Sequence, residues 1–148
     1  MSDAPGYACL IQGLAFAEAP RWRTTNGGEL WFSDFYTRQV MRVDREGRAH
    51  VVVEVPNQPS GLGWLPDGRL LVVSMIDRKL MRLDPAGLTQ VADLSAFAGF
   101  HCNDMVVDAK GRAYVTYGVH PSEIALRRFT LTDPRYPEED ATDTFPGQ

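Results

Sequence analysis

The chain has little of what marks several large classes of protein. Its only two cysteines, Cys9 and Cys102, lie far apart, without the close spacing of a disulfide framework or a zinc site, so both are expected to be reduced. The longest apolar run, LLVVSMI at 70–76, is interrupted and strand-sized, which argues against a membrane helix. The first residues lack the basic start and long apolar segment of a signal peptide. These absences predict a soluble, cytoplasmic protein without a membrane partner.

Positive charge is also sparse. Fifteen Lys and Arg residues stand against nineteen Asp and Glu, for a net charge of -4, and the basic residues are scattered singly. Without a basic stripe, nucleic acid is not an expected partner. The 148 residues are 44% hydrophobic, which is enough for the core of one ordinary globular domain.

The chain repeats itself at a propeller-like period. Three segments begin with Gly28, Gly68 and Gly111, which are 40 and 43 residues apart, and Asp44 and Asp84 also lie 40 residues apart. A period of this size is typical of propeller blades.

Each repeat is composed of short strands. The runs WFSD, VMRVD, AHVVVEV, LLVVSM, KLMRLD and LTQVADL are β-rich and are separated by turn signals such as NGG, REG, PDG and PAG. With a further strand before each turn, each repeat has about four strands. The prediction is an all-β, partial β-propeller of about three blades over residues 1–120. Residues 121–148 are predicted to form a polar tail, rich in Pro and acidic residues and partly disordered.

Polar residues stand where the innermost strand of each blade begins. Asn103 follows Ser60 by one repeat of 43 residues, and Glu18 occupies the corresponding place before Pro20 in the first unit. Innermost strands line a propeller's channel, so these three side chains are expected to converge. A carboxylate, a hydroxyl and an amide together suit a hard cation such as calcium. Alternatively, Asn103 and Asp104 satisfy backbone groups of a turn, and Glu18 forms an ion pair with Arg21.

Four stretches carry a family resemblance: EAPRW, LWFSDFYTRQVMRVD, PSGLGWLPDGRLLVVS and HCNDMVVDAKGRAYV. From about Leu14 to Val115 the chain resembles the amino-terminal half of the SMP-30/gluconolactonase/LRE family. The resemblance implies a six-bladed propeller with a divalent cation, usually calcium, at one end of the channel. It also implies hydrolysis of a lactone or related ester.

The resemblance assigns roles to individual residues. It implies that Glu18 is a metal ligand and that Asn103 faces the substrate and the metal site. His101 stands where related proteins often have an arginine that contacts substrate, so contact with a sugar-acid lactone does not follow. Asp104 is the candidate proton acceptor, and His101 is an alternative base or a substrate donor. Ser60 is a candidate substrate contact. The competing interpretations are a turn role for Asp104 and a rim position without chemistry for His101.

Other conspicuous residues are given structural roles. Trp22, Trp31 and Trp64 are expected to pack between blades, and Cys102 in the core. Turn roles are favoured for the remaining polar residues at strand ends: Ser33, Asp34, Asp44, Ser74 and Asp84.

Three blades are half of a six-bladed ring. A homodimer that closes the ring would present Glu18 and Asn103 twice around one channel. The functional hypotheses are a cation-dependent lactonase or esterase, a non-catalytic ligand-binding or assembly module, and a catalytically incomplete, shortened relative.

Overall fold

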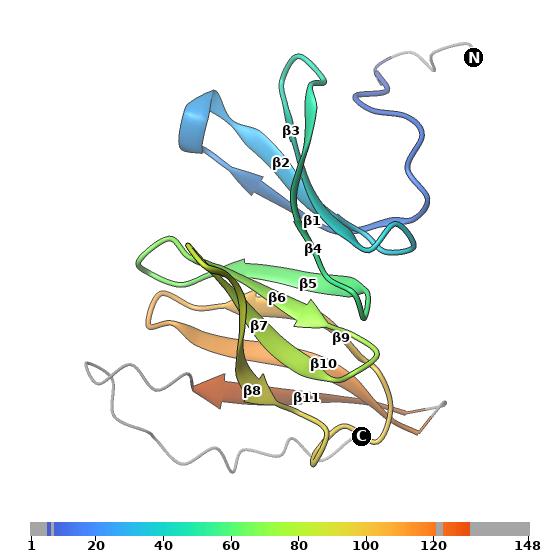
Figure 1. Cartoon of the computed structure of the whole chain (residues 1–148), viewed down its shortest axis with the longest axis vertical. Coiled ribbons are helices and arrows are strands. Elements are labelled where there is room, and N and C mark those ends of the chain that lie inside the picture. The colour runs from blue at the N-terminus through green and yellow to red at the C-terminus, as the bar shows by residue number, and fades with distance from the viewer. Residues whose placement is uncertain (1–5, 7, 121–122, 131–148) are drawn as a thin grey trace.

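The strands form three antiparallel sheets in chain order (Figure 1). The computed structural model describes residues 6, 8–120 and 123–130. The first sheet contains β1 (Ala17–Arg23), β2 (Glu29–Asp34), β3 (Gln39–Asp44) and β4 (Ala49–Glu54). The second contains β5 (Pro59–Trp64), β6 (Leu70–Ser74), β7 (Lys79–Asp84) and β8 (Gly87–Asp93), and the third β9 (Cys102–Val107), β10 (Arg112–His120) and β11 (Glu123–Thr130). Three successive up-and-down sheets confirm the predicted partial propeller.

The third sheet extends beyond the predicted limit of the propeller part. β10 and β11 form a hairpin in which Gly118 pairs with Ile124, so a limit at residue 120 falls inside the hairpin. Residues 123–130 therefore belong with the third blade, because their backbone completes its ladder. The rest of the predicted tail, 131–148, lies outside the described residues. In the described part of the chain, no helix has the length and apolar character needed to cross a membrane.

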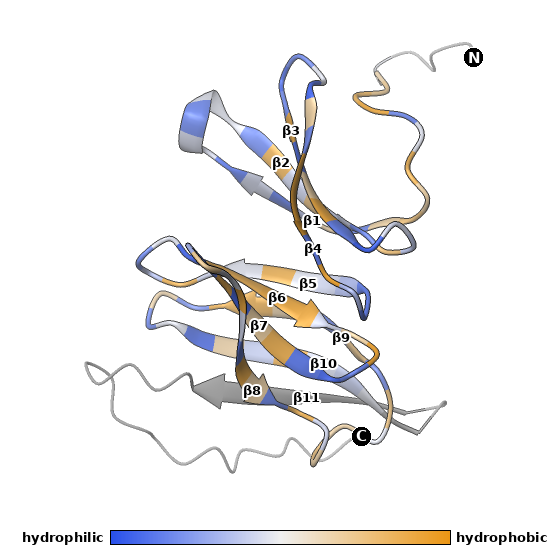
Figure 2. Ribbon diagram, viewed as in Figure 1, coloured by the Kyte–Doolittle hydropathy of each residue, from blue (hydrophilic) through white to orange (hydrophobic). Residues whose placement is uncertain are grey.

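The core lies between successive blades. β5 of the second blade contacts both β1 and β9, so the three innermost strands are neighbours. Apolar residues are dense on β6 and its neighbours (Figure 2), where Leu71 and Val73 pack toward Met105 and Val115 of the third blade. Burial of these side chains is what joins the sheets, because a blade alone cannot cover its own faces.

The tryptophans divide between the core and the surface. Trp31 and Trp64 meet edge to face with ring centroids 5.4 Å apart, which confirms the predicted packing between blades. The prediction for Trp22 is wrong, because this side chain is 51% exposed. Its neighbours Arg21 and Arg23 both reach the second blade, so strand alternation turns Trp22 to the opposite face of β1.

Two glycines let β5 and β9 approach closely. A Cβ at Gly61 would lie 2.4 Å from the Met105 nitrogen and 2.7 Å from the Asp104 carbonyl carbon. A Cβ at Gly63 would lie 2.4 Å from Cγ2 of Val107. The sequence PSGLGW therefore places small residues where two inner strands touch, and this contact fixes the spacing of the second and third blades.

The hairpin turns are closed by Asp–Arg pairs. Asp44 accepts hydrogen bonds from the backbone N–H groups of Glu46 and Arg48, and its carboxylate also pairs with the Arg48 guanidinium at 2.6 Å. Asp108 makes the same set of contacts with Lys110 and Arg112. The turn role predicted for Asp44 is confirmed, and Asp108 shows that the first and third blades use the same set of contacts.

Stability should fall in acid because of such pairs. Hydrogen bonds from Arg82 hold the pKa of Asp84 well below its ordinary value, and Arg48 lowers the pKa of Asp44. A carboxylate with a depressed folded-state pKa stabilises the fold fully above its unfolded-state pKa of about 3.9, and this stabilisation is lost as pH falls toward the lower value. The thermal midpoint should thus decline below about pH 4, and less steeply in Asp84→Asn. Equal slopes for the two proteins would contradict this assignment.

The two thiols should differ sharply in reactivity. Cys102 is fully buried, as predicted, and burial raises the pKa of its thiol to about 11, whereas Cys9 is exposed. Because the thiolate is the reactive form, a disulfide reagent at neutral pH should modify one thiol per native chain and a second only after denaturation. Cys9→Ser should then show no rapid reaction. Two fast thiols in the native wild-type chain would refute the buried position.

Candidate functional site

The innermost strands are irregular at the positions singled out in the sequence. Between the pairs Pro59↔Ser74 and Leu62↔Val72, β5 has one residue more than β6. β9 has the same extra residue relative to β10 between Cys102 and Met105, and β1 has it relative to β2 between Glu18 and Arg21. Such bulges bend a strand and redirect side chains, and they are common beside functional sites. We call the end of the sheets where β1, β5 and β9 begin the site end.

The bulges correct the alignment made from sequence. Ser60 and Asn103 are equivalent, as expected, because each directly follows the last paired residue before the bulge of its strand, Pro59 in β5 and Cys102 in β9. In β1 that place belongs to Ala19, and Glu18 corresponds to Pro59 and Cys102. The offset of one residue arises because the first blade has a longer turn before β2, which leaves the register undetermined from spacing alone. Ala19 has a φ of 51°, which is consistent with a sharp local bend.

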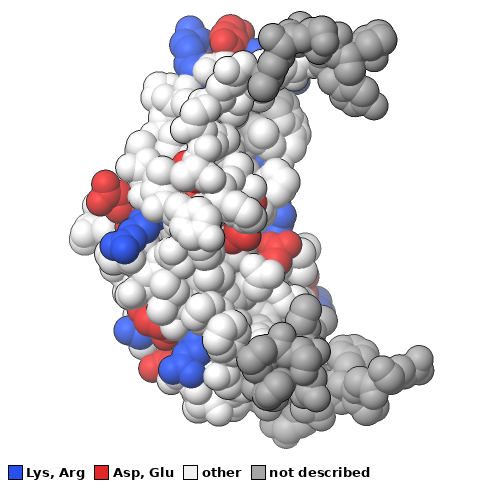
Figure 3. Space-filling model, turned by 90° about the vertical axis from the view of Figure 1, so that its right-hand side faces the viewer, with Lys and Arg blue, Asp and Glu red and all other residues white. Residues whose placement is uncertain are grey.

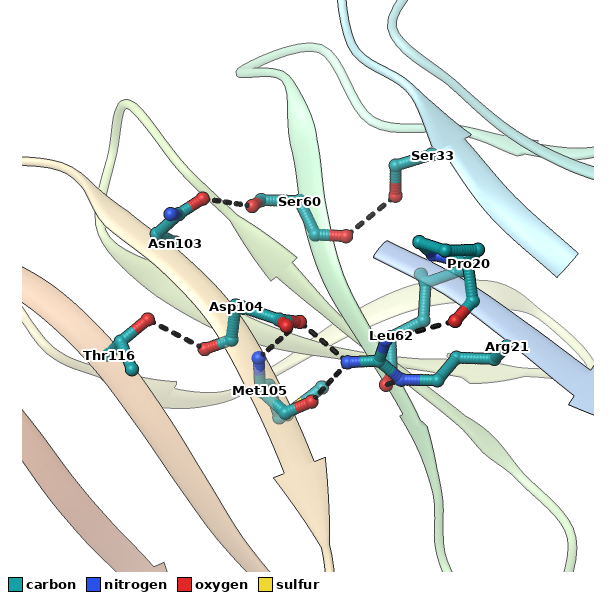
Figure 4. A network of polar contacts seen from close by, with 9 residues as sticks. All are labelled: Pro20, Arg21, Ser33, Ser60, Leu62, Asn103, Asp104, Met105 and Thr116. Carbon is teal, nitrogen blue, oxygen red and sulfur yellow. Dashed lines mark hydrogen bonds and ion pairs between the residues drawn. The ribbon is translucent and has the colours of Figure 1, made fainter. Parts of the chain in front are cut away.

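A chain of hydrogen bonds crosses the three blades at the site end (Figure 4). The Ser33 hydroxyl on β2 donates to the Ser60 carbonyl at 2.6 Å, and the Ser60 hydroxyl donates to Oδ1 of Asn103 at 2.9 Å. Ser33 and Ser60 are buried, whereas Asn103 is exposed. The structure thus brings Ser60 and Asn103 together, and leaves the second lone pair of the Asn103 oxygen free to accept another partner.

Glu18 is the second residue of β1, lies opposite Ser33 and has an unusual environment. Among buried side-chain oxygen and nitrogen atoms of the described residues, its Oε1 is the one without a hydrogen-bond partner. A buried carboxylate oxygen without a donor is costly, and such atoms are rare in folded proteins. A bound cation would remove that cost.

Arg21 pairs with Asp104 and not with Glu18. Its Nη2 donates to Oδ1 of Asp104 at 2.6 Å and to the Met105 carbonyl at 2.7 Å, and its Nε donates to the Leu62 carbonyl at 3.2 Å. One guanidinium on β1 therefore holds both β5 and β9 (Figure 4). Asp104 also accepts a hydrogen bond from the Met105 backbone N–H at 2.7 Å. These contacts give Asp104 a structural task at the start of β9.

His101 lies just before β9. Its imidazole stacks on the ring of Phe100, with centroids 4.2 Å apart and an angle of 20° between the planes. Its backbone carbonyl accepts a hydrogen bond from the Gly118 N–H, which ties it to β10. The half-buried imidazole thus stands at the site end with an aromatic neighbour.

The other polar residues at strand ends mostly close loops. Asp34 accepts hydrogen bonds from the backbone N–H groups of Ala15 and Phe16, and Ser74 donates to Asp77. Ser33 differs, because it links blades. Sequence alone did not identify the linking roles of Ser33 and Arg21. Strand alternation can point a side chain toward the channel, but it does not choose the partner on another blade.

Two of the predicted ligands have the chemistry of a hard-cation site. Glu18 has a carboxylate oxygen and Asn103 an amide oxygen, which are ligand types that calcium prefers. No group of three or more His, Cys, Asp or Glu residues suited to a metal is present in the described part of the chain. The oxygen atoms of Glu18 and Asn103 are therefore of the right kind for such a site but do not form a complete one.

Solved structures share the fold at low identity. The chain is similar to a gluconolactonase from Xanthomonas campestris, with a TM-score of 0.69 and 18% identity over 82% of this chain and 46% of that one. A putative gluconolactonase gives a TM-score of 0.63 at 18% identity, over 80% of this chain and 47% of that one. The virginiamycin B lyase of Staphylococcus aureus gives 0.54 at 15% identity, over 79% and 43%. The chain therefore spans less than half the length of each of these proteins.

Sequence comparison gives the family directly. A search among curated proteins found no match. The family model described as the SMP-30/Gluconolactonase/LRE-like region matches residues 16–122, which include all three inner strands. Because this match covers well over half of the chain and agrees with the sheet architecture, the chain belongs to the SMP-30/gluconolactonase/LRE-like family.

Proposed function

We propose that this chain supplies the amino-terminal half of a site for divalent-cation-dependent hydrolysis of a lactone or related ester. The observation that carries the proposal is the buried, unpartnered Oε1 of Glu18 at the site end. The neighbouring Ser60–Asn103 hydrogen bond adds an oriented amide oxygen. Family membership supports the same chemistry, and the gluconolactonase structures share the fold.

Each residue has a task in this proposal. Glu18 and Asn103 would hold the cation, preferably calcium, and the cation when bound would polarise the lactone carbonyl. Ser60 fixes the Asn103 side chain through its hydroxyl, so the amide is oriented before substrate arrives. His101 or Asp104 would accept the proton of the attacking water. His101 has the freer side chain, because Oδ1 of Asp104 is already bonded to Arg21 and Met105.

The test is hydrolysis of small lactones and aryl esters by the purified chain, with calcium and then with a chelator. Chelator-sensitive turnover that returns with added calcium is the expected result. Turnover that is unaffected by chelation would contradict the cation requirement. His101→Gln and Asp104→Asn then separate the two candidate bases, because loss of the base should remove the corresponding limb of the pH–rate profile.

Two further expectations stay predictions. A homodimer that closes the ring would be recognised by sedimentation at twice the chain mass. A binding or assembly module without catalysis would show calcium binding but no turnover of any lactone in the panel.

A further inference from the structure

Exposed apolar side chains gather at the site end. Phe16 precedes β1, Tyr36 and Ile76 lie in the β2–β3 and β6–β7 loops, and Phe100 precedes β9. Their exposed fractions are 53%, 64%, 44% and 46% in that order. We call these four residues the apolar rim. Each of the three blades contributes to the apolar rim. Large apolar side chains that are exposed together usually mark a binding surface.

The rim is adjacent to the candidate site. Phe16 is two residues from Glu18, and Phe100 is three residues from Asn103. Three extended residues span at most about 11 Å, so a group attached to a ligand at Asn103 can reach the rim. Phe16 and Tyr36 already contact each other edge to face, with centroids 5.8 Å apart. Phe16, Tyr36 and Phe100 are therefore beside the candidate site, and Ile76 lies in a loop at the same end of the sheets.

Several polar groups of the same loops are already bonded within the protein. Asp77 accepts hydrogen bonds from Ser74 and Asn57 and pairs with Lys79 at 3.5 Å. Arg78 donates to the Ala98 carbonyl, and the Asp34 carboxylate accepts two backbone N–H groups. Figure 3 shows the molecule from the site end. Charged residues lie at the left of this view and in a small group near its middle, and the visible surface between them is mainly uncharged. Recognition of a polyhydroxylated ligand needs many free donors and acceptors, and the two carboxylates and the guanidinium just named are already bonded.

From this arrangement we infer that the site takes lactones or esters that carry an alkyl or aromatic group, in preference to polyhydroxylated sugar lactones. This inference rests on the proposed function and narrows its substrate class. The apolar group would lie on Phe16, Tyr36 and Phe100, while the ring carbonyl would lie near Asn103. The area that such a group removes from water would then set specificity.

The test compares two six-membered lactones, δ-decalactone and glucono-δ-lactone. Binding is measured by NMR titration in the presence of a chelator, so that it does not depend on turnover. δ-Decalactone should bind about tenfold more tightly, as burial of about two methylene groups of its alkyl chain implies. Tyr36→Ser and Phe100→Ser should each weaken binding of δ-decalactone severalfold. Two control variants should leave this binding unchanged: Tyr36→Phe, which keeps the aromatic ring, and Val51→Ser, which alters an exposed apolar residue on β4.

The outcomes separate this inference from the proposed function. Equal affinity for the two lactones, or δ-decalactone binding that both rim variants leave unchanged, would overturn the inference. Rim variants that instead change sedimentation would assign the rim to a protein contact, which also overturns it. Turnover is scored separately with calcium present. δ-Decalactone binding that depends on the rim, without turnover, supports the inference and contradicts the proposed function. Turnover with tighter binding of the sugar lactone supports the proposed function and contradicts the inference.

Discussion

Glu18→Gln is expected to reduce cation-dependent lactone hydrolysis by about 100-fold or more, since even supporting residues of metal sites cost 10- to 100-fold. The same change should leave the metal-free fold as stable as before, or more stable. The Oε1 atom is buried and makes no hydrogen bond, so removing its charge relieves an unfavourable burial. This combination of lost activity and retained stability is typical of a functional residue and not of a structural one.

The measurement pairs kinetics with thermal unfolding in chelator. Glu46→Gln is the matched control, because Glu46 lies in the exposed β3–β4 turn away from the site end. The control should retain both activity and stability. A Glu18→Gln protein that hydrolyses lactones at the wild-type rate would remove Glu18 from the site. A Glu18→Gln protein that is markedly less stable in chelator would show that the carboxylate has a structural partner.

Gly61→Ala is expected to destabilise the fold by about 3 kcal/mol, at the upper end of the usual cost of overpacking. The added Cβ would meet the backbone of β9, at Met105 and Asp104, and backbone cannot rotate aside. β5 and β9 would have to separate, and the Ser60–Asn103 hydrogen bond would lengthen with them. Both stability and the candidate site should therefore suffer.

Gly63→Ala is the internal comparison. Its Cβ would meet Cγ2 of Val107, a side-chain atom that can move by a change of rotamer, so the cost should be about 1 kcal/mol. Denaturant unfolding of the two variants gives the two values. Equal costs, or a neutral Gly61→Ala, would contradict the close approach of the inner strands.

The blade architecture could be predicted because its causes are local. Turn sequences such as PDG and REG, the alternating apolar runs and the 40-residue period each act within a hairpin. The bounds of β2, β3, β6 and β7 accordingly follow the runs WFSD, VMRVD, LLVVSM and KLMRLD closely. The limit placed at residue 120 was wrong because β11 is recognised as part of the blade through its pairing with β10.

The site could be predicted only in part. Ser60 and Asn103 were paired by the repeat, and the repeat holds because they occupy equivalent positions in the bulges of β5 and β9. Glu18 was aligned one residue away from its structural equivalent, because the loop length of the first blade conceals the register. The partner of Arg21 depends on how β1, β5 and β9 approach one another, which no local pattern encodes. The register of β1 and the partner of Arg21 are thus the parts of the site that needed a structure.

Calcium binding to the purified chain, measured by titration calorimetry beside Glu18→Gln, tests the central claim most directly. The account predicts saturable binding by the wild-type chain and its loss in the variant, because Glu18 has the carboxylate oxygen that lacks a partner at the site end. Equal binding by the two proteins, or no binding by the wild-type chain, would contradict it.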